Sequence, residues 1–235
     1  MNTVFSMLFI FEIGCVFGWG LELVFRRIIN PDKRWVNPGF LIGPYLPLYG
    51  FGLSVLYLIA NLESYLPLQN TVVRSIILFI LMGLAMTFLE YIAGIIFIKK
   101  MKIKLWDYSN MRWNFQGIIC PIYSVFWTIL GIIYYYALHP HITDAVNFAF
   151  KSVLTYFVLG LFCGFFIIDL VYSMHIVAKI KAFAEEQQVV VKLEELKANI
   201  IKTAEERKHK ARFFRILSNE NTVIKNLMHF KGEKK

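Results

Sequence analysis

The chain lacks the cysteine pattern of a disulfide-stapled or cysteine-rich metal protein. It has three cysteines in 235 residues: Cys15, Cys120 and Cys163, with no paired spacing. All three fall inside apolar segments, where a free cysteine behaves as a small hydrophobic residue. The sequence therefore predicts neither a disulfide framework nor a cysteine metal site.

Motifs for nucleotide and metal binding are also missing. The sequence has no Gly-x-x-x-x-Gly-Lys-Ser/Thr loop, so the chain does not hydrolyse ATP through a phosphate-binding loop of its own. His139 and His141 flank Pro140 in an expected outer loop, but no third ligand stands nearby. We expect no metal, no cofactor and no catalytic residue.

Hydrophobic residues are abundant instead. They make up 57% of the chain, aromatic residues make up 17%, and the mean hydropathy is +0.55, above the values of soluble domains. Five segments are long enough to cross a hydrocarbon core of about 30 Å as helices. They cover approximately residues 4–25, 39–62, 73–98, 115–138 and 153–178. The sequence predicts an all-α integral membrane protein with five transmembrane helices in a domain of residues 1–178.

The first apolar segment has the position of a signal peptide but not its composition. It lacks a basic N-terminal region and a small-residue cleavage site, and it carries Glu12 and Glu22. We therefore expect a retained span.

Basic residues gather in two of the predicted loops. They follow the first and third spans: Arg26, Arg27, Lys33 and Arg34, then Lys99, Lys100, Lys102, Lys104 and Arg112. The other two loops hold little beyond Arg74 and Lys151. Positive loops favour the cytoplasmic side. We therefore expect a multi-pass protein with the N-terminus outside and the C-terminus in the cytoplasm.

A glutamate near the end of an apolar span occurs twice. Glu22 and Glu90 are each followed by a basic loop, a Trp/Asn/Gly cluster and Pro-x-Tyr. Because the first and third spans run in the same direction, these two-helix repeats are parallel, and the two glutamates should face each other in the inner half of the membrane. An ionisable side chain in hydrocarbon costs about 3 kcal/mol or more and tends to mark function. The predicted substrate or proton site comprises Glu22, Asn37, Tyr49, Glu90, Asn114, Tyr123 and Asp169.

A structural role for these carboxylates is the alternative. Glu22 can form a helical ion pair with Arg26. Glu90 has no basic residue at helical spacing inside its apolar segment, so its partner comes from another helix, from water or from a proton. A neutral glutamate hydrogen-bonded to backbone or to a tyrosine would fix helix packing without binding a solute.

Residues 37–50 contain three prolines and three glycines, which makes a regular helix improbable. One interpretation is a kinked helix entry with close glycine packing. The other is a broken helix end whose freed carbonyls coordinate a ligand. In the second repeat, residues 107–109 suit a turn, and Trp106 and Tyr108 are typical interfacial anchors.

Residues 179–235 form a predicted cytoplasmic tail with 14 Lys or Arg against 8 Asp or Glu, a net charge of +6. Val189, Leu193, Leu196 and Ile200 repeat at helical spacing and predict an amphipathic helix. Its expected continuation at 207–215 mixes basic and aromatic residues, which favours attachment to an anionic leaflet. A short coiled coil with a second copy or a partner is the competing interpretation, and we expect no nucleic acid.

Four groups of residues together resemble a known family. They are Gly18-Trp19-x-x-Glu22, Asn37-Pro38-Gly39-Phe40-Leu41-x-Gly43-Pro44-x-x-Pro47-x-Tyr49-Gly50, Leu89-Glu90-Tyr91 and Trp106-Asp107-Tyr108-Ser109. The pattern resembles the bacterial family named putative ABC-transporter type IV, the CmpB-like permease-type membrane proteins. The resemblance covers residues 5–140 approximately and implies a transport permease in the bacterial plasma membrane.

Three functions are compatible with these features. The first is a permease-like subunit for a small solute, driven by a separate ATPase subunit or a proton gradient. The second is a membrane enzyme acting on a lipid or lipid-linked substrate at the cytoplasmic face. The same carboxylates would act as acid or base, with Arg26, Arg27 or Arg112 holding a phosphate. The third is a scaffold or sensor that acts through the tail. Because five spans are few for a complete permease, we expect a homodimer or a hetero-complex in the lipid bilayer.

Overall fold

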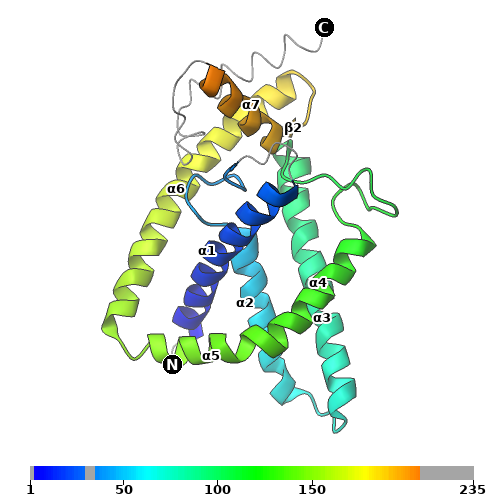
Figure 1. The fold of residues 1–235 in the computed structure, drawn as a ribbon, viewed down its shortest axis with the longest axis vertical. Coiled ribbons are helices and arrows are strands. Elements are labelled where there is room, and N and C mark those ends of the chain that lie inside the picture. Colours follow the sequence, from blue (N-terminus) through cyan, green and yellow to red (C-terminus); the bar gives the residue numbers. More distant parts are fainter. Residues whose placement is uncertain (1–2, 30–34, 207–235) are drawn as a thin grey trace. The chain divides into compact units, whose positions relative to one another are not determined.

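The computed structural model describes residues 3–29 and 35–206 and is mostly helical, at 76% (Figure 1). Within these described residues, four helical stretches are long and apolar enough to cross a membrane: Thr3–Ile28, Thr71–Lys100, Pro121–Ala149 and Val153–Glu186. Helix α1 is Thr3–Ile29 and α6 is Val153–Glu186. Helix α3, Thr71–Gly94, continues through the π-helix η2, Ile95–Lys100. The prediction of a mostly helical chain with membrane-length apolar helices is confirmed.

The predicted second span contains a shorter helix. Helix α2 covers Pro47–Asn61, 15 residues, and a 3-10 turn η1, Leu62–Tyr65, follows it. At about 1.5 Å per residue, α2 is about 22 Å long, less than a hydrocarbon core of about 30 Å. Residues 39–46 stay outside the helix, as their prolines and glycines predict. The arrangement of five spans in two repeats remains a prediction.

The predicted loop around Pro140 is helical, and this prediction was wrong. Helix α4, Pro121–Ile133, continues through the π-helix η3, Tyr134–Leu138, into α5, His139–Ala149. Pro140 has no N–H for the carbonyl of Tyr136, and the wider turn of a π-helix accommodates such a missing bond. Proline is also tolerated in the first turn of a helix, where Pro140 stands in α5.

The chain divides into two compact units. The first unit contains residues 3–16, Pro47–Ala93 and Asp107–Cys163. The second contains residues 17–29, 35–46, Gly94–Trp106 and 164–206.

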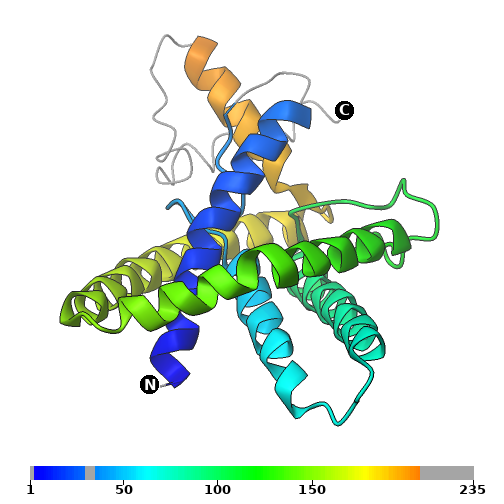
Figure 2. The same cartoon turned by 60° about the horizontal axis from the view of Figure 1, so that its bottom comes forward.

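The first unit has its core between α2, α3 and α4. Leu56 and Ala60 of α2 pack with Met82 and Met86 of α3 and with Tyr134. Figure 2 shows the short connection between α2 and α3, in cyan.

Small residues also bring α1 and α2 together in the first unit. A Cβ added to Gly14 would lie 2.9 Å from the Cα of Gly50, and one added to Gly50 would lie 2.5 Å from the Sγ of Cys15. The buried Cys15 is therefore a packing residue, as the sequence predicts.

The second unit buries part of the tail. Strand β1, Ile103–Lys104, pairs in parallel with β2, Val191–Lys192. Helix α7, Leu193–Glu206, follows β2 directly. Its side chains of Leu193, Leu196 and Ile200 pack in one hydrophobic cluster with Ile176 and Ile180 of α6.

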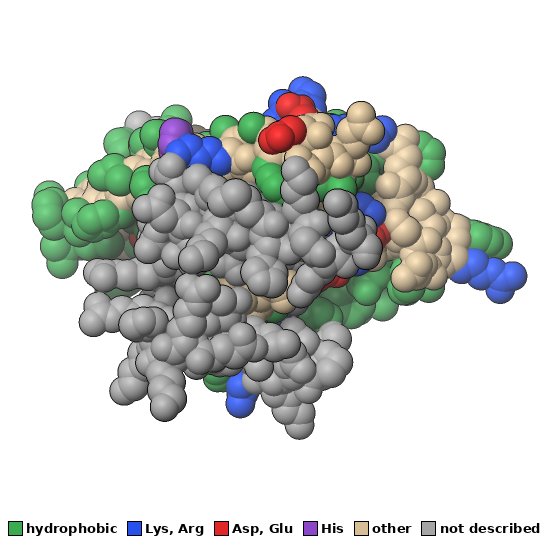
Figure 3. All heavy atoms as spheres, turned by 90° about the horizontal axis from the view of Figure 1, so that it is seen from above, with side chains coloured by type: hydrophobic (Ala, Val, Ile, Leu, Met, Phe, Trp, Pro, Cys, Tyr) green, Lys and Arg blue, Asp and Glu red, His purple; other side chains and the backbone are tan. Residues whose placement is uncertain are grey.

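Large apolar side chains remain exposed on the candidate spans. In the most apolar stretch of 18 residues in α6, only 6% is buried. Phe157, Phe165 and Ile168 of this helix are all exposed. Figure 3 shows exposed hydrophobic side chains beside charged ones on one face of the described residues. Such surfaces are unfavourable in water and suit contact with lipid. The exposed apolar helices support a membrane location.

Candidate functional site

Glu90 is buried near the end of α3 in the first unit. Its side chain is 4% exposed. The Tyr108 hydroxyl donates to Oε1 at 2.8 Å, and Nε1 of Trp127 in α4 donates to Oε2 at 3.0 Å. Both carboxylate oxygens therefore have a neutral donor, and no ion pair to Glu90 occurs among the described residues. The hypothesis of a partner from another helix is confirmed for Trp127.

The loop before α4 brings Tyr108 to Glu90. The Tyr108 ring stacks on that of Tyr123, with centroids 4.4 Å apart and planes at 13°. The Tyr108 N–H donates to the Gly117 carbonyl at 2.9 Å. Burial, together with the adjacent Glu90 carboxylate, raises the pKa of the Tyr108 phenol above its ordinary value. Tyr108 therefore stays protonated and donates to Glu90 throughout the physiological pH range.

Asn114 organises the same loop. Its amide donates to the carbonyls of Ser109 and Met111, and its Oδ1 accepts from the Gly117 N–H at 2.9 Å. Gly117 has φ +69°, a left-handed conformation that favours glycine. Asn114 thus holds the loop that carries Tyr108 and does not itself contact Glu90.

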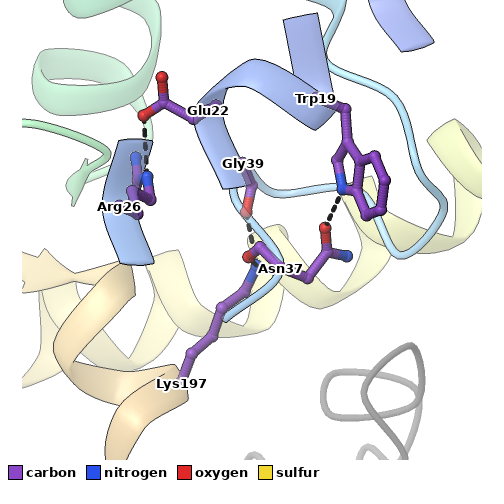
Figure 4. A network of polar contacts seen from close by, with 6 residues as sticks. All are labelled: Trp19, Glu22, Arg26, Asn37, Gly39 and Lys197. Atoms are coloured by element: carbon purple, nitrogen blue, oxygen red, sulfur yellow. Dashed lines mark hydrogen bonds and ion pairs between the residues drawn. The ribbon is translucent and has the colours of Figure 1, made fainter. Parts of the chain in front are cut away.

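In the second unit, Glu22 contacts a residue of its own helix. Nε of Arg26 lies 2.8 Å from Oε1 of Glu22, one helical turn away (Figure 4). This is the local ion pair that the sequence spacing allows. Arg27 also has an intrachain contact, because its guanidinium lies 4.5 Å from the ring centroid of Trp35.

Asn37 lies at the start of the irregular segment 35–46. Its Oδ1 accepts from Nε1 of Trp19 at 2.7 Å (Figure 4). Its amide donates to the carbonyls of Leu41 and Ile42. Asn37 and Asn114 therefore have the same local role, since each amide donates to two backbone carbonyls of its own loop. Each is followed by a glycine with positive φ, Gly39 at +75° and Gly117 at +69°.

Lys197 of α7 also binds the segment 35–46, which the sequence did not predict. Its side chain is 3% exposed, and Nζ donates to the carbonyls of Asn37 at 2.8 Å and Gly39 at 2.6 Å (Figure 4). One feature of the sequence could have indicated this contact. Lys197 follows Leu193 by four residues, so it lies on the predicted apolar face of the tail helix. A lysine on such a face needs buried acceptors.

Asp169 of α6 binds the other end of this segment. Its carboxylate accepts from the N–H groups of Ile42 and Gly43, at 3.2 and 2.7 Å, and from the Tyr45 hydroxyl at 2.7 Å. Ser173, one turn later in α6, donates to it as well. Four donors saturate the carboxylate, so in this structure Asp169 positions the segment 42–45.

Two predicted residues remain, Tyr49 and Arg112. Tyr49 lies in α2, where its backbone oxygen is 2.9 Å from the position that a Cβ of Gly14 would take. Arg112 is exposed in the loop before α4. Glu22 lies in one unit and Glu90 in the other, so their predicted juxtaposition stays a prediction.

A second polar cluster in the first unit was missed by sequence reasoning. Glu63 of η1 accepts a hydrogen bond from the Tyr135 hydroxyl and lies 3.1 Å from Nε of Arg74 in α3. His139 lies beside it, with Nδ1 3.1 Å from the Tyr134 hydroxyl. These residues are far apart in the sequence, and only the packing of three helices brings them together. No cluster of three or more His, Cys, Asp or Glu suited to a metal occurs in residues 3–29 and 35–206.

A comparison with known protein families matches the region of the chain that contains Glu22 and Glu90. The family model described as putative ABC-transporter type IV matches residues 9–174, which include both glutamates, the segment 35–46, the loop 107–119 and Asp169. The chain belongs to this family. The family match ends before the tail helix that carries Lys197. No curated protein and no solved structure matches the chain.

Proposed function

We propose that the chain is the membrane subunit of a small-solute transporter, with Glu90, Tyr108 and Trp127 as the centre of its polar site. The observation that carries the proposal is the buried Glu90 carboxylate, which has two neutral donors and no ion pair among the described residues. A buried carboxylate without a cationic partner can accept a proton or bind a cationic group of a solute. Energy comes from a separate ATPase subunit, which the family description favours, or from a proton gradient, since the sequence contains no phosphate-binding loop of its own.

The site is proposed to be composite, with Glu22, Asn37, Tyr49, Asn114, Tyr123 and Asp169 in supporting positions. Asn114 and Tyr123 hold Tyr108, while Asn37 and Asp169 hold the segment 35–46. We place the protein in the bacterial plasma membrane, N-terminus outside, as the loop charges predict.

The first prediction concerns the Glu90 carboxylate. A panel of amines, amino acids and metal cations is screened for solutes that raise the melting temperature of the purified full chain in detergent. A solute present at 100 times its Kd stabilises the folded state by about 2.7 kcal/mol. We expect Glu90→Gln to lose the shift for such a solute, because Gln keeps the shape and removes the charge.

The control for this screen is Glu195→Gln, which removes an exposed carboxylate that pairs with Lys192. This variant should keep the shift. The variant Glu22→Gln tests whether the site is composite. In a composite site this variant also loses the shift in melting temperature, whereas in a site confined to the predicted second repeat it keeps the shift. An unchanged shift in Glu90→Gln would contradict the proposed site.

A further inference from the structure

The loop between β1 and α4 displays two aromatic side chains and a cation at the surface. Trp113 is 79% exposed and Phe115 is 54% exposed, and Arg112 between Met111 and Trp113 is exposed as well. Burying a large aromatic side chain is worth several kcal/mol in water. An exposed tryptophan does not contribute this free energy within the chain. Contact with a lipid or a partner can supply it instead.

The backbone of this loop holds Trp113 in a costly conformation. Trp113 has φ +61° and Gln116 has φ +58°, in the left-handed region that costs roughly 1–2 kcal/mol for residues other than glycine. The bonds of Asn114 to Ser109, Met111 and Gly117 enclose these two positions. The loop is thus fixed by its own hydrogen bonds with Trp113 outward, and does not fold over it.

Helix lengths place the loop near a membrane boundary. The loop follows the C-terminal end of α3 and connects two candidate spans, Thr71–Lys100 and Pro121–Ala149, each long enough to cross a hydrocarbon core of about 30 Å. The loop contacts this end of α3 through Tyr108, which binds Glu90, and through Phe115, whose ring lies 5.8 Å from that of Tyr91. On the other side the loop leads into α4 at Pro121 (Figure 1).

The charge of the surrounding sequence is positive. Between residues 99 and 112 the chain has five basic residues and one acidic residue, Asp107, a net charge of +4. Each basic residue near an anionic leaflet contributes about 1 kcal/mol to attraction. Tryptophan is the residue that membrane proteins concentrate at the headgroup level.

We propose that the loop 107–119 is an anchor for anionic phospholipid. Trp113 inserts among the headgroups of the adjoining leaflet, and Arg112 binds a lipid phosphate. The proposal is independent of the transport function, because it rests on the exposed side chains, the loop backbone and the lengths of the two spans that the loop connects.

The test measures the depth of position 113 in a bilayer. The full chain with Trp113→Cys carries a fluorescent label and is reconstituted into vesicles of equal parts phosphatidylglycerol and phosphatidylcholine. We expect a nitroxide on the lipid headgroup to quench the label several-fold more strongly than it quenches a label at Glu186→Cys, an exposed position of α6. The unsubstituted chain gives the background from Cys163. Arg112→Cys is labelled in parallel, in case Trp113→Cys does not fold.

Lipid retention tests the role of Arg112. Arg112→Gln should retain about five-fold less phosphatidylglycerol than the parent chain after purification, at unchanged phosphatidylcholine. Equal retention of phosphatidylglycerol overturns the phosphate contact. A label at 113 that a water-soluble quencher reaches as well as at 186 overturns the anchor. A label shielded from both quenchers overturns it too, because a protein partner then covers the loop.

Discussion

Asp169 and Glu90 are both carboxylates of candidate spans, and their neighbours give them different roles. Asp169 accepts from two backbone N–H groups, a phenol and a hydroxyl. Among the residues that the structure describes, Glu90 accepts from two side chains, Tyr108 and Trp127. Sequence spacing identified both residues as candidates because charge in an apolar segment is rare. It could not separate their roles, since three of the four donors to Asp169 come from 124 to 127 residues earlier in the chain, a separation that no helical periodicity encodes.

The second prediction concerns Asp169. Asp169→Asn replaces one acceptor oxygen by an amide that meets the N–H groups of the segment 42–45, and leaving buried donors unpaired costs about 1–3 kcal/mol. We expect a lower melting temperature of the purified chain in detergent. Asp144→Asn, an exposed acid of α5, is the matched control and should melt with the parent chain. Equal melting of both variants would show that the contacts to Asp169 are dispensable.

At the scale of elements, the tail helix is part of the second unit. The sequence predicts its apolar stripe at Val189, Leu193, Leu196 and Ile200. The prediction was wrong for Val189, because α7 begins only at Leu193, and the structure buries the other three side chains against α6. The membrane attachment predicted for residues 207–215 lies outside the described residues. The stripe alone could not distinguish a lipid surface from the chain's own helix, because both bury apolar area equally well.

The third prediction concerns the contact of α7 with the segment 35–46. Lys197→Met keeps the length of the side chain but removes the ammonium that binds the Asn37 and Gly39 carbonyls. We expect faster amide hydrogen exchange in residues 35–46, since local opening costs less without these bonds. Lys192→Met, on the same tail with an exposed partner Glu195, should leave that exchange unchanged. The contact is unimportant if both variants exchange alike.

At the scale of the whole molecule, whether α2 crosses the membrane decides on which sides the two termini lie. The four membrane-length helices alone would place both termini on the same side, whereas a crossing by α2 with residues 39–46 places them on opposite sides. Composition predicted where apolar segments lie but not where helices begin and end. Pro47 and the glycines before it shorten α2, and Pro140 did not end α4 because a π-helix precedes it.

The fourth prediction is that the two termini lie on opposite sides of the membrane. A reporter that is active only outside the cytoplasm should work when fused to the N-terminus and fail when fused to the C-terminus. Fusion after Tyr65, at the end of η1, is the internal control and should report the outer side. The same side for both termini would remove α2 from the spans and would also remove the parallel repeat.

The fifth prediction concerns the assembly. Mild purification of the full chain from its native membrane should retain an ATPase subunit or a second copy, because the chain has no ATPase motif of its own. The mass of the complex in detergent distinguishes the two. A single chain with no ATPase activity in the purified material would contradict this assembly.

The distance in sequence between Lys197 and its acceptors has a consequence for synthesis. The Asn37 carbonyl reaches the ribosome exit 160 residues before Lys197. At about 5–20 residues per second, it waits roughly 8–32 s for its partner. Until Asp169 has been made, the segment 35–46 has neither partner, so its backbone must remain hydrated or be shielded by the insertion machinery. The segment therefore completes its contacts only after most of the chain has been synthesised.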